Sequence, residues 1–366
     1  MQFQALSGAL SGGMTDVVRA HSGPHDPGPA LSGSRWLSEW AFEPVPLLGI
    51  LLAGGLYLTG VRLMHKRANP WPASRTVCFL TGLLWLLIAV ASPLASYDTV
   101  LLSVHMVQHM LLAMVGPVFL VLGAPITLAL RTLPARPRGI VLAVIHSRYA
   151  AVLTHPVVAG AIFILNPFVL YFTGLYEQTL RHPWLHDLNH LHFVAVGTLW
   201  YATLLAVDPL PRRPTYPLRV IAAFLTMPFH AWLGVAIMSM NTLIASDWYL
   251  GMDRTWGASP LSDQKTAGGI LWSSGDIIGL IVFAALFRGW VRDSEREARR
   301  EDRRLDRIEA TEAARMSQGD GGRGPRASRP APAFGPRALK AQIRSGEPIS
   351  PGASPAPRPD DQETLT

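Results

Sequence analysis

Residues 103–125 read "SVHMVQHMLLAMVGPVFLVLGAP", an apolar run with two histidines four positions apart near its beginning. About 20 apolar residues are enough for an α-helix to cross the hydrocarbon core of a bilayer. The run therefore predicts a membrane-spanning helix. Ionisable side chains inside such a helix are costly, and they usually face the interior of a helix bundle, where they have partners. His105 and His109 thus indicate a site inside a bundle.

The composition of the whole chain is that of a membrane protein. Of its 366 residues, 49% are hydrophobic and only 16% are charged, and the mean hydropathy is positive, which is unusual for a soluble globular protein. Seven apolar runs are long enough to span a bilayer: 46–64, 76–95, 99–122, 155–173, 187–206, 217–244 and 266–287. We therefore expect an all-α, polytopic membrane protein with a bundle of seven transmembrane helices.

The charged residues between the runs predict the orientation of the chain. Arginine and lysine are concentrated in the loops after the first, third, fifth and seventh runs, whereas the alternate loops carry mainly acidic residues, among them Asp98, Asp187 and Asp263. Because cytoplasmic loops of membrane proteins carry an excess of basic residues, we expect an external N terminus and a cytoplasmic C terminus. The formal charge of +7 then reflects orientation, and we expect no nucleic-acid partner.

Composition divides the rest of the chain into three further segments. Residues 1–45 are rich in Gly, Ser and Pro, so we expect a flexible extracytoplasmic tail before a transmembrane domain at 46–290. Residues 291–316 alternate both signs of charge at helical spacing, which predicts a charged cytoplasmic helix. The composition of residues 317–366 predicts a disordered cytoplasmic tail.

A second pair of histidines repeats the spacing of the first. His186 and His190 come at the beginning of the fifth run, as His105 and His109 come at the beginning of the third. Residues four apart share one face of a helix, and both runs enter the membrane from the same side. We therefore expect four imidazoles to meet in the outer half of the bundle. Imidazole suits copper, zinc and iron, and Asp263, before the seventh run, is expected to complete the metal site or to orient a ring.

Other residues leave alternatives open. Met106 and Met110 are either soft ligands, which favour Cu(I), or apolar packing residues. His230 and Asp276 both fall near the middle of the membrane. They either form a proton-linked pair, or Asp276 accepts a hydrogen bond from a Ser or Trp side chain. The four histidines themselves would, on the alternative hypothesis, make separate polar contacts between helices.

Three motifs together resemble the CtaG family of cytochrome c oxidase assembly factors. They are "HMVQHMLLAMVGPVFLVLGAPITLALRTLP" at 105–134, the second histidine pair, and "DQKTAGGILW" at 263–272. The resemblance runs from about residue 45 to residue 290 and implies a polytopic protein of the inner (plasma) membrane that supplies copper to the oxidase. It also places the two histidine pairs of the family on the pairs described above, and its Asp-Gln on Asp263 and Gln264. The two tails have no counterpart in the family.

The predicted function is therefore assembly of cytochrome c oxidase, with copper bound by His105, His109, His186, His190 and Asp263. The expected partners are oxidase subunits and the lipid bilayer, and we expect an assembly factor or metallochaperone rather than an enzyme. The alternative is a membrane-embedded zinc-dependent hydrolase in which Asp263 acts as a base. A haem between the third and fifth runs and a scaffold without metal also remain open.

Overall fold

The computed structural model describes residues 27–30, 33, 40 and 43–319. Most of each tail, predicted at 1–45 and at 317–366, lies outside the described residues, and residues 317–319 belong to the last helix. The described residues form helices and turns. The helices are α3 (Pro44–Lys66), α4 (Ala73–Ala91), α5 (Pro93–Tyr97), α6 (Leu102–Met110), the π-helical η1 (Leu111–Val115), α7 (Gly116–Leu122), α8 (Pro125–Thr132), α9 (Ala135–Ile145), α10 (Arg148–Leu153), α11 (Pro156–Phe172), α12 (Leu175–Arg181), α13 (Pro183–Leu205), α14 (Tyr216–Ser239), α15 (Ser246–Gly251) and α16 (Pro260–Gly319).

Each of the seven apolar runs corresponds to a long helix, but fewer than seven meet the length and apolarity of a membrane span. Five candidate spans are present in the described part of the chain: α3, α4 with α5, α6 through α7, α14, and α16. The pair α11 and α12, bent by 71°, makes a sixth if it is counted as one span. The remaining run forms α13, 23 residues long, whose first turns carry polar side chains and lower its apolarity. The all-α class is confirmed, with five or six candidate spans.

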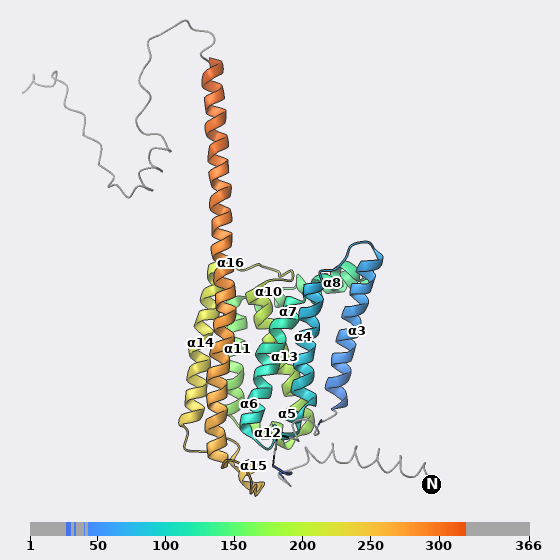
Figure 1. Cartoon of the computed structure of the whole chain (residues 1–366), viewed down its shortest axis with the longest axis vertical. Coiled ribbons are helices and arrows are strands. Elements are labelled where there is room, and N and C mark those ends of the chain that lie inside the picture. The colour runs from blue at the N-terminus through green and yellow to red at the C-terminus, as the bar shows by residue number, and fades with distance from the viewer. Residues whose placement is uncertain (1–26, 31–32, 34–39, 41–42, 320–366) are drawn as a thin grey trace, which may run out of the picture. The chain divides into compact units, whose positions relative to one another are not determined.

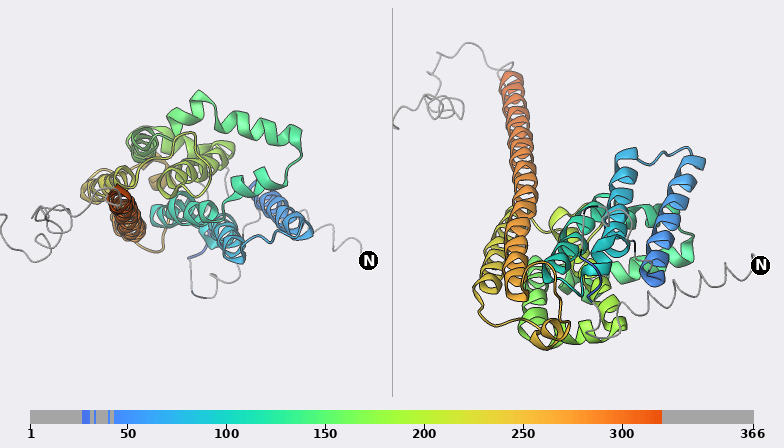
Figure 2. Two further views of the ribbon diagram at one scale, coloured as in Figure 1. Left: turned by 90° about the horizontal axis from the view of Figure 1, so that it is seen from above. Right: turned by 60° about the horizontal axis from the view of Figure 1, so that its bottom comes forward.

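The long helices pack side by side, and the short helices gather at the ends of the bundle (Figure 1). Helix α7 packs against α4 and α13, and α11 packs against α13 and α14. Seen from above, α3 lies at one edge of the bundle and α14 with α16 at the other (Figure 2). Helices α5, α12 and α15 lie at the end where α6, α13 and α16 begin (Figure 1). That end holds the polar site.

Close helix crossings place the polar helices in contact with their neighbours. A Cβ atom on Gly197 of α13 would lie 2.1 Å from the carbonyl oxygen of Ala113 in η1. A Cβ atom on Gly234 of α14 would lie 2.6 Å from the carbonyl oxygen of Gly268 in α16. Glycine lets helix backbones approach this closely in membrane bundles. The crossing at Gly197 joins α13, which carries one histidine pair, to η1, which directly follows α6 and its histidine pair.

The compact unit that holds the bundle ends at Glu297. Helix α16 continues as a second unit from Ala298, and its described part is charged and largely exposed. The helix predicted for residues 291–316 therefore lies within a single helix of 60 residues that begins at Pro260.

Candidate metal centre

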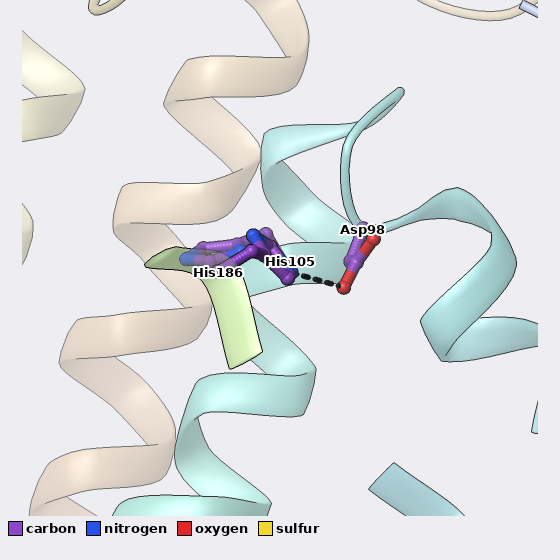
Figure 3. A group of neighbouring side chains, drawn as sticks. All are labelled: Asp98, His105 and His186. Carbon is purple, nitrogen blue, oxygen red and sulfur yellow. Dashed lines mark hydrogen bonds and ion pairs between the residues drawn. The ribbon is translucent and has the colours of Figure 1, made fainter. Parts of the chain in front are cut away.

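Two helices and one turn bring three polar side chains together. Helix α5 begins at Pro93, where the side chain of Ser92 accepts a hydrogen bond from the backbone N–H of Leu94. It ends at Tyr97, and Asp98 follows in the turn that leads to α6. This turn places Asp98 beside His105 in the first turns of α6 and His186 in the first turn of α13 (Figure 3).

The ligand atoms of Asp98, His105 and His186 all lie within 4.8 Å of one another, and we call these residues the inner trio. The Nε2 atom of His186 is 2.9 Å from the Oδ2 atom of Asp98. The ring centroids of His105 and His186 are 6.1 Å apart. The exposed fraction of each of the three residues is 1% or less. Two imidazoles and a carboxylate thus converge at a buried position.

His105 is the unusual member of the inner trio. Neither of its ring nitrogens has a hydrogen-bond partner among the described residues. Its neighbours are mainly aromatic, with the ring of Tyr176 at 5.0 Å and that of Tyr171 at 6.3 Å between centroids. Buried polar atoms are nearly always hydrogen-bonded, and the exceptions point to strain, to chemistry or to a bound water or ion. A cation held by His105, His186 and Asp98 would satisfy this imidazole.

The ring of Tyr176 packs against His105, and its hydroxyl forms a hydrogen bond with a second buried tyrosine. The hydroxyl of Tyr176 is 2.7 Å from that of Tyr249 in α15. Burial raises the pKa of Tyr249, which lies outside the candidate spans, so its hydroxyl stays neutral. The anionic ligand of the trio is therefore Asp98.

His109 and His190, the second members of the two pairs, lie one helical turn deeper. The Nδ1 atom of His109 is 3.0 Å from the hydroxyl of Tyr171, and its ring centroid is 3.7 Å from that of Phe193. The Nε2 atom of His190 is 3.1 Å from the Oε1 atom of Gln108. The structure brings His105 and His186 together. His109 and His190 lie close to this pair and have hydrogen-bond partners of their own, Tyr171 and Gln108.

Asp263 fixes the start of α6 instead of joining the inner trio. Its two carboxylate oxygens accept hydrogen bonds from the backbone N–H and the hydroxyl of Ser103, two residues before His105. The neighbouring Gln264 accepts a hydrogen bond from the backbone N–H of Ile244 at 2.7 Å. The motif at the start of α16 thus holds loops and helix ends around the trio.

Sequence reasoning missed Asp98 as a candidate ligand. It entered the argument only as an acidic residue of an external loop. The available signal was its position seven residues before His105, at the end of the membrane where both histidine pairs were expected. The carboxylate nearest to the histidines therefore comes from the loop before the third run, not from the one before the seventh.

The other singled-out residues lie away from the inner trio. His192 is exposed, and its Nε2 atom is 2.8 Å from the Oδ1 atom of Asn166. His230 lines a cavity of about 20 Å³ deeper in the bundle, together with Met114 and Met227. Asp276 interacts with the side chain of Trp272, in agreement with one of the two alternatives for this residue.

The chain is similar to one protein family and to proteins from mycobacteria. Residues 55–293 match the family model of the cytochrome c oxidase caa3 assembly factor, Caa3_CtaG. The uncharacterized protein Mb0105 of Mycobacterium bovis and the uncharacterized protein MT0111 of Mycobacterium tuberculosis are each 38% identical over 273 residues. The uncharacterized protein ML1998 of Mycobacterium leprae is 36% identical over 271 residues. These matches cover 72% of this chain but only 41% of each relative.

No solved structure matches the chain. The family match, in contrast, covers more than half of the chain, and it includes the inner trio, both histidine pairs and the motif at Asp263. The chain, a helical protein with a buried cluster of histidine and aspartate, therefore belongs to the Caa3_CtaG family of cytochrome c oxidase assembly factors.

Proposed function

We propose that this protein assists assembly of cytochrome c oxidase by binding copper at the inner trio and passing it to an oxidase subunit. The family match supports the link to the oxidase. The main support for a metal site is the environment of His105. This buried imidazole lies beside Asp98 and His186, and neither of its nitrogens is hydrogen-bonded among the described residues. Copper is the cargo of the protein in this proposal.

The donor set suits a borderline metal ion. Imidazole nitrogen binds copper and zinc well, and one carboxylate adds the negative charge that stabilises a cation in a buried site. Three protein ligands leave a coordination position open, which an incoming ligand from another protein can occupy. Copper then leaves by exchange of ligands, with no change in the fold of the donor.

The remaining predicted site residues surround the inner trio in this proposal. His109 and His190 lie one turn further along α6 and α13, beside the inner trio. Asp263 holds the backbone of Ser103 and thereby the position of His105. The proposed site is thus the five residues predicted from the sequence together with Asp98.

The proposal includes the predicted membrane topology. All seven long helices cross the inner (plasma) membrane, α13 as the fifth span, with the bilayer as the environment of residues 46–290. The first turns of α6, α13 and the start of α16 lie at the outer face, and the C-terminal segment is cytoplasmic. Copper then reaches the site from the external side, where the acidic loops are.

Metal analysis on purified full-length protein tests the proposal. Protein from copper-supplemented cells should carry copper, His105→Ala should lose it, and His192→Ala, the same substitution at an exposed histidine of α13, should keep it. Because His105 is buried, His105→Ala leaves a cavity and should lower the unfolding temperature, so thermal unfolding in detergent is measured alongside and copper content is compared on folded protein. Wild-type copper content in His105→Ala would refute the site. Firmly bound zinc with esterase or amidase turnover would instead support the hydrolase alternative.

A further inference from the structure

A second group of ligand-type side chains lies beside the inner trio. Glu43, directly before α3, and Asp187 and His190, both in α13, each offer a ligand atom within 4.8 Å of those of the other two. We call these residues the outer trio. Glu43 is 7% exposed and His190 is 4% exposed, whereas Asp187 is half-buried. The outer trio therefore has one member that is only half-buried, unlike the inner trio.

Hydrogen bonds on the far side of His190 decide which of its nitrogens can bind an ion. The side-chain amide of Gln108 donates to the carbonyl oxygen of Ala89 at 3.0 Å, so its Oε1 atom points toward His190. That oxygen can only accept, which places the proton of the imidazole on Nε2. The Nδ1 atom of His190 then carries the lone pair that a metal requires, and Gln108 orients the ring, as outer hydrogen bonds commonly do for metal-binding histidines.

The charge of the outer trio favours a cation. Glu43 and Asp187 bring two carboxylates within 4.8 Å of each other, so the outer trio offers two anionic ligand groups and one imidazole. Two carboxylate oxygens and one imidazole nitrogen form a harder set of ligands than the two imidazoles and one carboxylate of the inner trio. They suit divalent ions such as Cu(II) or Zn(II) better than Cu(I).

The two trios are adjacent. The ring centroids of His186 and His190, one from each trio, are 4.4 Å apart. The Nε2 atom of His190 is 3.8 Å from the Oδ2 atom of Asp98. An ion at the outer trio therefore lies one side chain away from the buried site.

We propose that Glu43, Asp187 and His190 form a second, divalent-cation site, through which the inner trio is loaded. The binding of a cation to the outer trio stands on its own geometry. The loading role rests on the proposed function, because it requires that the inner trio hold the cargo.

The test counts Cu(II) ions and their nitrogen ligands in full-length protein in detergent. The variant Glu43→Gln/Asp187→Asn removes both carboxylates of the outer trio and keeps the shape of the side chains. The variant His105→Ala impairs the inner trio alone. The control Glu177→Gln/Asp247→Asn removes two carboxylates from α12 and α15, at the same end of the bundle (Figure 1). Mass spectrometry gives the metal content, and electron paramagnetic resonance gives the number of nitrogens on each Cu(II).

We expect wild type and control to bind about two Cu(II) ions per chain, and each of the other two variants to bind about one. The ion that remains in Glu43→Gln/Asp187→Asn should show two nitrogen ligands, and the ion that remains in His105→Ala should show one. The single substitution Asp187→Asn, at the half-buried position, should weaken the one-nitrogen ion even if the double variant unfolds.

The two proposals fail in different ways. If the outer trio binds no ion, Glu43→Gln/Asp187→Asn and Asp187→Asn bind as much Cu(II) as wild type, and His105→Ala binds none. If the inner trio binds no ion, His105→Ala binds as much Cu(II) as wild type. The Cu(II) signal with one nitrogen ligand is then present in both wild type and His105→Ala. An adjacent location of the two sites also predicts magnetic coupling between the two Cu(II) ions in wild type, which neither variant should show.

Discussion

Replacing Asp98 by asparagine separates the role of this residue as a ligand from its role in stability. Asparagine has nearly the shape of aspartate, and its amide oxygen can still accept the hydrogen bond from Nε2 of His186, which is 2.9 Å long in the wild type. The substitution removes the one negative charge of the inner trio. Loss of a carboxylate that orients or binds at a metal site typically costs about 10- to 100-fold in metal affinity, or about 1.4 to 2.7 kcal/mol.

The metal-free protein should respond differently. Exchanging a buried charge for a neutral group of the same shape is often close to neutral for stability, because the desolvation cost of the charge disappears together with its interactions. We expect the free energy of unfolding of metal-free Asp98→Asn to change by no more than about 1 kcal/mol. The matched control is Asp208→Asn, near the opposite end of the bundle. Asp208 accepts hydrogen bonds from the backbone N–H groups of Ile126 and Thr127 at the start of α8, so its replacement should cost about 1 to 2 kcal/mol of stability and leave copper affinity unchanged.

Competition with a copper chelator measures the affinity, and thermal unfolding in detergent measures the stability. The reasoning is refuted if Asp98→Asn binds copper as tightly as wild type. It is also refuted if Asp98→Asn loses stability as Asp208→Asn does while both keep their copper, because Asp98 would then have a structural role only.

Three further substitutions test how the bundle holds the site. Gly197→Val should destabilise the protein by about 1 to 3 kcal/mol and lower its copper content, because a side chain there collides with the carbonyl of Ala113; Gly139→Val, in open space, should do neither, and equal melting temperatures would contradict the packing argument. Asp263→Ala should cost about 1 to 3 kcal/mol in thermal unfolding, since Ser103 loses both of its acceptors; an unchanged melting temperature would show that these hydrogen bonds do not hold α6. Gln108→Met should cost about 1 to 3 kcal/mol in the same assay, because the carbonyl of Ala89 and the imidazole of His190 lose their partner inside the bundle; a stable variant with wild-type Cu(II) binding would show that Gln108 does not orient the ring.

The sequence by itself determined the helices and the level at which the polar site lies. An apolar run of about 20 residues has no alternative to a helix in a bilayer, since every backbone group must find its partner within the segment. A spacing of four residues places His105 and His109 on one face of that helix, and the same holds for His186 and His190. The convergence of His105 with His186 follows from these two regularities and from the parallel direction of their helices.

Only the tertiary structure decided which side chains share a site. Residues four apart on a helix differ in height by about 6 Å, so an ion at the level of His105 and His186 is a full turn above His109. The choice of Asp98 over Asp263 depends on how α5 turns into α6 and on the hydrogen bonds that Asp263 makes with Ser103. Periodicity fixes the face and depth of a residue within its own helix, but the path of a loop over the helix ends depends on the packing of the whole bundle. For that reason the carboxylates of both trios, which come from loops and helix ends, could not be assigned from spacing.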